Sequence, residues 1–204
     1  MNALIYVEGG ARGADSKNLR IQCQRGFKKL LERMGFNARQ PRLVACVGRD
    51  DVHARFCIEH ASRRAAYVAV WIDSEEPVNN LEAAWGHLEG VKTVGRWERP
   101  EAATDDQVLF MTTCMETWMV ADQKTLQSHY GSNLHENALP PLEDLESRSR
   151  EEVQRKLGHA TRRCKNAYEK GKRSFTLFEL LNPEALQKHL PRFVRVRRIL
   201  NARL

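Results

Sequence analysis

Acidic side chains follow two apolar segments of this chain, and they are the residues best suited to carry out chemistry. The segment 4–7 runs into Glu8 and two glycines, and the segment 67–72 runs into Asp73 and Glu75, which are separated by one serine. Short unbroken apolar runs are typical of strands that are covered on both faces, and open α/β sheets bind ligands at the carboxyl ends of their strands. In an extended chain, residues two positions apart point to the same face. We therefore expect Glu8, Asp73 and Glu75 to be catalytic and to bind one hard cation, Mg²⁺ or Mn²⁺, through carboxylate oxygens.

Two other interpretations of these segments stay open. Acidic residues at strand ends are also common in tight turns, where they bind no metal. The glycine-rich stretch 9–13 could hold a phosphate on backbone N–H groups at the start of the next helix, or it could form only a turn. The stretch matches neither G-x-x-x-x-G-K-[ST] nor G-x-G-x-x-G. The sequence therefore does not favour a nucleoside triphosphatase or a dinucleotide-binding protein.

A second pair of acids, Glu116 and Asp122, lies in the segment 115–122, which also carries apolar residues at helical spacing. In a helix, residues six positions apart lie about 120° away from a common face, so these two carboxylates cannot easily chelate one ion. We expect them to have structural roles, accepting hydrogen bonds or pairing with an arginine such as Arg49. A supporting role beside the metal is the less favoured alternative.

The order of the expected elements predicts an α/β fold. Apolar runs predict strands over 4–8, 42–48, 67–73 and 108–111, and amphipathic or capped segments between and after them predict helices. Alternation of strands and helices at this spacing is typical of right-handed crossovers and a mainly parallel central sheet flanked by helices. The Glu8 and Asp73 strands must then lie side by side for their acids to meet. Further helices are expected from 16 to 34, from Asp51, around 81–88, over 115–122, from Ser149 towards 164, and from 182 and 191.

Positive charge is concentrated near the C-terminus of the chain. Residues 148–204 hold 16 Lys and Arg against 5 Asp and Glu, whereas residues 1–147 hold 17 against 21. This separation suits a polyanion that is held beside a metal site, although a solvated basic surface would give the same composition. We expect phosphates of a nucleic acid to be bound by five residues, namely Arg12, Arg49, Lys170, Lys172 and Arg173.

Cysteine, histidine and apolar residues limit the remaining classes of function. The 5 cysteines are scattered without a CxxC pair, and the 7 histidines show no metal-ligand spacing, so we expect reduced thiols and no zinc site. No apolar run approaches the length that spans a bilayer, and the first residues lack a basic stretch followed by a long apolar one. The expectation is a cytoplasmic protein that does not insert into membranes.

A series of short motifs resembles one protein family in order and spacing over more than 160 positions. They are VEGG at 7–10, Arg25-Gly26-Phe27, Gly48-Arg49, IDSEEPV at 72–78, 85–88, MTTCMETWMVAD at 111–122, 129–131, 157–161 and YEKGKRSF at 168–175. Together they resemble a bacterial family with a domain of unknown function that is thought to be TOPRIM-like, related to OLD-type nucleases and often encoded beside ATPases in defence loci. TOPRIM enzymes carry a Glu at the end of the first strand and D-x-D at the end of a later one. This chain departs from the pattern with D-S-E at 73–75.

The resemblance implies a TOPRIM-like α/β domain at 1–139 with a basic helical C-terminal extension at 140–204 packed on it. It also implies a magnesium-dependent nuclease of an anti-phage defence system, with nucleic acid and an ATPase as partners. The alternative is a nucleic-acid-binding or assembly subunit that keeps the fold without the chemistry, and the D-S-E departure favours it. A phosphotransferase or phosphatase for small molecules is less favoured, because the usual nucleophile and phosphate loop are missing.

Overall fold

Four parallel strands form the central sheet of the protein, for which we describe a computed structural model covering residues 2–9, 16–91, 96–171 and 173–204. The strands are β1 (Ala3–Glu8), β2 (Arg42–Cys46), β3 (Tyr67–Asp73) and β4 (Val108–Met111), in the order β2-β1-β3-β4. All three pairings are parallel, so the predicted α/β class is confirmed. β1 and β3 are neighbours, as the expected meeting of Glu8 and Asp73 requires.

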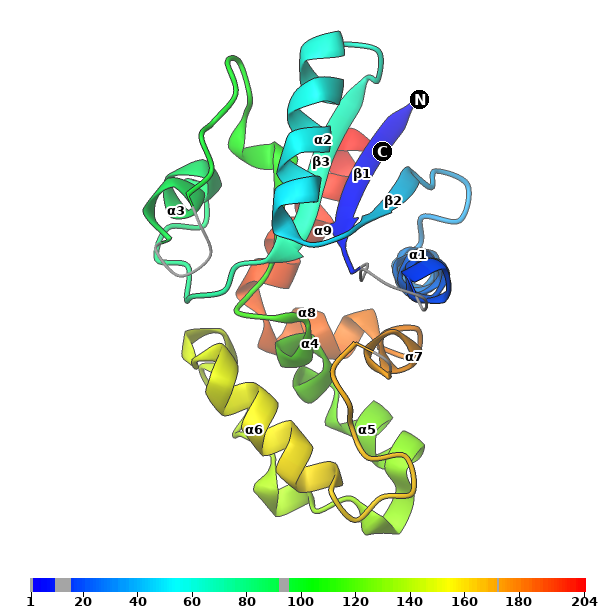
Figure 1. Cartoon of the computed structure of the whole chain (residues 1–204). Helices are drawn as coiled ribbons and strands as arrows, with labels where there is room; N and C mark the ends of the chain where they lie inside the picture. Colours follow the sequence, from blue (N-terminus) through cyan, green and yellow to red (C-terminus); the bar gives the residue numbers. More distant parts are fainter. Residues whose placement is uncertain (1, 10–15, 92–95, 172) are drawn as a thin grey trace.

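Helices follow the strands and complete the chain, as Figure 1 shows. Their bounds are α1 Ser16–Arg33, α2 Arg49–Ser62, α3 Ala84–Gly90, α4 Met115–Ala121, α5 Gln123–Tyr130, α6 Arg150–Thr161, α7 Ser174–Phe178, α8 Pro183–His189 and α9 Pro191–Arg203. Short 3-10 turns lie at Asp105–Gln107, Gly131–Asn133, Glu136–Ala138 and Leu145–Ser147. No helix in the described ranges is long and apolar enough to cross a membrane.

The second strand and second helix differ from the sequence prediction at their shared boundary. The strand was expected to reach Gly48 and the helix to begin at Asp51, whereas β2 ends at Cys46 and α2 begins at Arg49. Gly48 has a φ of 82°, a conformation that glycine adopts readily and that turns the chain out of the strand before the helix. The earlier start brings Arg49 into the first turn of α2.

Side chains that alternate along the strands build one apolar core on each face of the sheet. Ile5 and Val7 of β1 pack with α1 and α9, whereas Leu4 and Tyr6 pack with α2 and α3. This alternation follows from the two-residue period of a strand, and the continuous apolar runs follow from burial on both faces. The sheet is thus the middle layer between two layers of helices.

Helices from the second half of the chain gather beyond the carboxyl edge of the sheet. Figure 1 shows α4, α5, α6 and α7 at that end, and the apolar core that includes β1 and β3 continues through them to α9. Trp118 of α4 lies at the centre of this core, against Trp71, Phe178 and Phe193. The basic segment 148–204 therefore contributes both to the core and to the surroundings of the strand ends that carry the acids.

Candidate functional site

Glu8 and Asp73 line one cavity of about 200 Å³ at the carboxyl edge of the sheet, and Glu116 of α4 lines it with them. The cavity also takes residues from α1, α6 and the segment before α7. These further lining residues are Gly9, Leu19, Gly48, Met115, Arg150, Lys170, Gly171, Ser174 and Phe175. Three carboxylates and two cations from separate parts of the chain therefore converge on one small space.

The position of Glu8 depends on the close packing of the residue after it. A Cβ atom on Gly9 would lie 2.4 Å from the Cys23 sulfur and 2.6 Å from the Phe175 ring, which is closer than real Cβ contacts. Only glycine therefore lets the end of β1 lie between α1 and α7. Oxygen Oε2 of Glu8 is buried and has no hydrogen-bond partner among the residues that the structure describes. An unpaired buried carboxylate oxygen is costly, so this position favours a bound proton or a bound ligand.

Asp73 is held through both its side chain and its backbone. Its Oδ1 accepts a hydrogen bond from the backbone N–H of Met115 at 2.9 Å, and its carbonyl oxygen accepts one from Nη1 of Arg49 at 2.9 Å. The guanidinium of Arg49 lies over the Trp97 ring, 4.9 Å from its centroid, and the side chain is buried. Arg49 was predicted to bind nucleic acid, and the structure places its guanidinium on the strand end that carries Asp73.

Burial and nearby negative charge raise the pKa of Asp73 in the cavity. Burial raises the pKa of Asp73 well above its ordinary value, and the negative charges of Glu116 and Glu8 raise it further. Burial also raises the pKa of Glu8, whereas the positive charges of Arg49, Arg150 and Lys170 oppose that shift. Like charges in a poorly hydrated space favour a bound proton or a cation. The cavity should therefore bind a proton or a cation.

Glu75 leaves the path that the sequence predicted. β3 ends at Asp73, and Glu75 has a φ of 68°, so the chain is not extended between the two acids. Its backbone N–H donates to the Thr113 carbonyl at 2.9 Å, and its carboxylate forms an ion pair with Arg150. The extended D-S-E geometry is therefore wrong, and Glu75 does not line the cavity with Asp73.

Glu116 lies in the cavity, a position that the sequence analysis treated as the less favoured alternative. Tyr168 donates its hydroxyl hydrogen to Glu116 Oε1, and the Gln154 side-chain amide donates to Oε2 at 3.2 Å. A helix that follows the last strand of a parallel sheet starts at the carboxyl edge, and this rule was the available signal for an acid in its first turn. Asp122 accepts hydrogen bonds from the backbone N–H groups of Thr125 and Asn182, so the expectation that these acids accept hydrogen bonds is confirmed for both.

The five cations predicted to bind nucleic acid have separate surroundings. Lys170 is exposed and lines the cavity. Arg173 donates from Nη1 to the carbonyl of Ala167 at 2.6 Å, so its guanidinium supports the loop before α7. Arg12 and Lys172 lie outside the described residues. Arg150 was not predicted, yet it lines the cavity together with Lys170.

The sequence comparison identifies the family. A family model for a domain of unknown function, DUF4276, matches residues 11–200. The chain belongs to the DUF4276 family. Searches of curated proteins and of solved structures found no match. The DUF4276 match spans the central sheet from β2 onward together with the basic C-terminal segment, and it begins just after Glu8 and Gly9.

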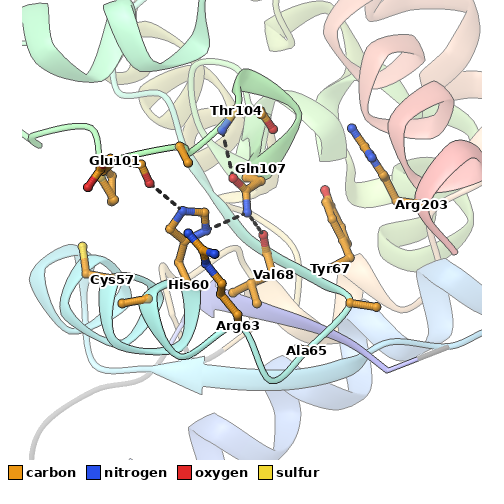
Figure 2. A pocket seen from close by; sticks show the side chains of 14 residues that line it. Cys57, His60, Arg63, Ala65, Tyr67, Val68, Glu101, Thr104, Gln107 and Arg203 are labelled. Atoms are coloured by element: carbon orange, nitrogen blue, oxygen red, sulfur yellow. Dashed lines mark hydrogen bonds between the residues drawn. The ribbon is translucent and has the colours of Figure 1, made fainter.

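A larger cavity of about 550 Å³ in this DUF4276 chain lies at the start of β3, away from the carboxylates (Figure 2). His60 contacts the Glu101 carbonyl at 3.0 Å and the Gln107 amide nitrogen at 3.2 Å, and Gln107 also donates to the carbonyl of Val68. Figure 2 shows this network across the cavity, where the polar groups bind one another. The smaller cavity, whose acids have unmet charge, is the better candidate for chemistry.

The smaller cavity could bind a hard cation through only one or two protein oxygens. In the part of the chain that the structure describes, no group of three or more His, Cys, Asp and Glu side chains could hold a metal ion. Magnesium commonly keeps several waters and binds one or two carboxylates together with substrate phosphates. The unpartnered Oε2 of Glu8 and the second oxygen of Asp73 fit that smaller requirement.

Proposed function

We propose that this protein is a metal-dependent hydrolase of phosphodiester bonds in nucleic acid, with a TOPRIM-like arrangement of acids. The observation that carries the proposal is the convergence of Glu8, Asp73 and Glu116 on one cavity, where burial and mutual repulsion raise the pKa of Asp73. Burying such acids is unfavourable for folding, and sites of this kind are typical of functional clusters. A divalent cation between Glu8 and Asp73 would neutralise them.

Magnesium or manganese would be held by Glu8 and Asp73, which supply oxygen ligands of the kind these ions prefer. Bound there, the ion would supply Lewis acidity, lowering the pKa of a bound water and stabilising charge on the phosphate. Asp73 is fixed for this role by the Met115 N–H, which leaves its other oxygen for the ion. Glu75 is not part of this ligand set, because it pairs with Arg150.

The other polar groups of the cavity have roles that follow from their charge. Burial raises the pKa of Glu8, so this carboxyl group takes up a proton more readily than an ordinary glutamate and can exchange it with water or a leaving oxygen. Tyr168 and Gln154 hold the Glu116 carboxylate in place. Lys170 and the positive C-terminal segment attract the phosphate backbone, an interaction that salt should weaken.

The second candidate function is a nucleic-acid-binding or assembly subunit without hydrolysis, for instance beside an ATPase of a defence system. Two observations favour it: Glu75 is bound to Arg150, and no described group of three or more acids, cysteines and histidines could hold a metal. The two candidates share the basic segment and differ at the acids. A test must therefore separate binding from cleavage.

The decisive experiment measures cleavage of labelled single-stranded and double-stranded DNA and RNA in Mg²⁺ or Mn²⁺, alone and with a candidate ATPase. Glu8→Gln and Asp73→Asn should each lower cleavage by about 100-fold or more, because each removes a ligand charge from the ion. Glu89→Gln is the matched control, since Glu89 is exposed on α3 and lies outside the cavity. A wild type that binds nucleic acid, cleaves none of the substrates and gains no thermal stability from either ion would support the assembly subunit instead.

A further inference from the structure

The side chain of Arg150 is held in place beside the carboxylate cavity. It is the first residue of α6, where the Ser149 hydroxyl accepts a hydrogen bond from the Glu152 N–H and fixes the start of the helix. Its side chain lines the cavity and forms an ion pair with Glu75. The exposed fractions of the Arg150 and Glu75 side chains are 20% and 8%. The cation is therefore held in one place while part of it remains open to the cavity.

The chain around Glu75 explains why the arginine is held so firmly. Glu75 has a positive φ and donates its backbone N–H to the Thr113 carbonyl. Thr113 in turn donates its hydroxyl hydrogen to the Arg148 carbonyl at 3.1 Å, just before α6. The end of β3, the turn before α4 and the start of α6 are thus linked. A strained acidic residue in a turn is more readily explained by the cation it orients than by the turn alone.

The charge of Arg150 acts directly on the two candidate ligands. Its positive charge opposes the rise in the pKa of both Glu8 and Asp73, which places it within electrostatic reach of each. An arginine presents five N–H donors in a planar fork, and the Glu75 carboxylate can accept at most two in a bidentate pair. The remaining donors suit a phosphate, which arginine binds with better geometry than lysine does.

We propose that Arg150, oriented by Glu75, binds a phosphate of the nucleic acid in the carboxylate cavity, with Lys170 as the second cation. This inference rests on the proposed function for the identity of the substrate. Glu75 is a positioning residue in this arrangement and not a metal ligand. The phosphate enters between the two cations and faces Glu8 and Asp73.

The test is a binding experiment that does not depend on turnover. Fluorescence anisotropy of 5′-fluorescein-labelled 20-nucleotide single-stranded DNA and RNA is followed in calcium instead of magnesium, across a series of salt concentrations. The variants are Arg150→Gln, Arg150→Lys, Glu75→Gln and the double variant Glu75→Gln/Arg150→Gln. Arg155→Gln is the control, because Arg155 is exposed on the same helix and outside the cavity. Melting temperatures show that each variant is folded.

Arg150→Gln and the double variant should bind about 10-fold or more weakly, and their salt slope should fall by about 0.7. Arg150→Lys should keep the slope with reduced affinity, because it keeps the charge but loses the fork. Glu75→Gln should also keep the slope. Binding and slope equal to wild type in the folded double variant, or no binding of either probe by the wild type, would overturn the inference. If binding depends on Arg150 but magnesium supports no cleavage, the proposed hydrolase activity is contradicted and the phosphate-binding role of Arg150 still stands.

Discussion

The side chain of Asp73 accepts a hydrogen bond from the backbone N–H of Met115 at 2.9 Å, which ties the end of β3 to the start of α4. Oxygen Oδ1 thereby has a fixed partner, and this hydrogen bond also fixes the orientation of the second carboxylate oxygen. Asn can make the same hydrogen bond without the negative charge. The substitution Asp73→Asn therefore isolates the charge of the site from its shape.

In the absence of divalent metal at pH 7, Asp73→Asn should raise the melting temperature. The pKa of Asp73 is higher in the folded protein than in the unfolded chain, so its contribution to stability is full at low pH and is lost as pH rises through the folded pKa. The neutral amide removes that loss, and each kcal/mol gained corresponds to about 2–4 °C in a chain of this size. Added Mg²⁺ or Mn²⁺ should reverse the order, because it stabilises the wild type more than the variant. Thermal melts in EDTA and in each ion measure both effects.

Asp122→Asn is the control, and it should lower the stability of the protein where Asp73→Asn raises it. Both oxygens of Asp122 accept backbone N–H groups, at 3.2 Å from Thr125 and 2.7 Å from Asn182. An amide would direct its own donors at one of those N–H groups, so the free energy of unfolding should fall by about 1–3 kcal/mol whether or not metal is present. Equal responses of the two variants to metal would contradict the assignment of Asp73 to the site.

Gly9→Ala should destabilise the protein by about 1–3 kcal/mol, because the new methyl group would overlap Cys23 and Phe175. The displaced end of β1 should also move Glu8, so metal-induced stabilisation should weaken. Gly86→Ala is the comparison, since it lies inside α3 and its Cβ would meet only the Ala83 side chain at 3.9 Å. That substitution should stabilise by about 0.5–1 kcal/mol through helix propensity. Chemical denaturation of both variants would show whether the signs differ as stated.

Glu146 should make the protein less stable as pH rises from about 4.5 to about 7. Burial is the main cause that raises the pKa of Glu146 to about 7, against the opposing effect of its hydrogen bonds with Arg192. Because the folded pKa lies above the ordinary value of 4.5, this group's contribution is full below 4.5 and is lost as pH approaches 7. The loss should be on the order of 1–3 kcal/mol. The difference in unfolding free energy between wild type and Glu146→Gln should therefore change across this window, and parallel curves would contradict the shift.

The strands and their shared edge could be predicted because the signal for each is local. Apolar runs that end in Glu8 and Asp73 identify buried parallel strands, and the crossover rule then brings the two acids to one edge. The path of Glu75 could not be predicted in this way. Its positive φ is unusual for a residue with a long side chain, and only the contacts with Thr113 and Arg150 select it.

The remaining parts of the site depend on contacts between residues that are distant in the sequence. Arg150 is 75 positions from its partner Glu75, and nothing in the local sequence distinguishes it from the other arginines of the basic segment. Glu116 was weighed by its spacing from Asp122, which was the wrong comparison. Its position is set by the start of α4 at the sheet edge and by Tyr168, 52 residues away. The sequence predicted that cations lie near the acids and named Lys170, which lines the cavity, but it missed Arg150.

Trp118→Ala should lower the stability of the sheet and of the C-terminal helices together, because the two parts share one core. Trp118 is fully buried, and its ring lies 5.9 Å from Trp71 of β3, 5.9 Å from Phe178 of α7 and 4.9 Å from Phe193 of α9. Removing it leaves a cavity between these elements and should cost about 3–5 kcal/mol. Trp118→Phe should cost much less, because it keeps an aromatic ring and removes an indole N–H that has no hydrogen-bond partner in the described ranges. Hydrogen exchange measures the coupling: in Trp118→Ala, protection of β3 and α9 should fall together. Loss of protection in α9 while β3 keeps its own would instead show that residues 140–204 unfold independently of the sheet.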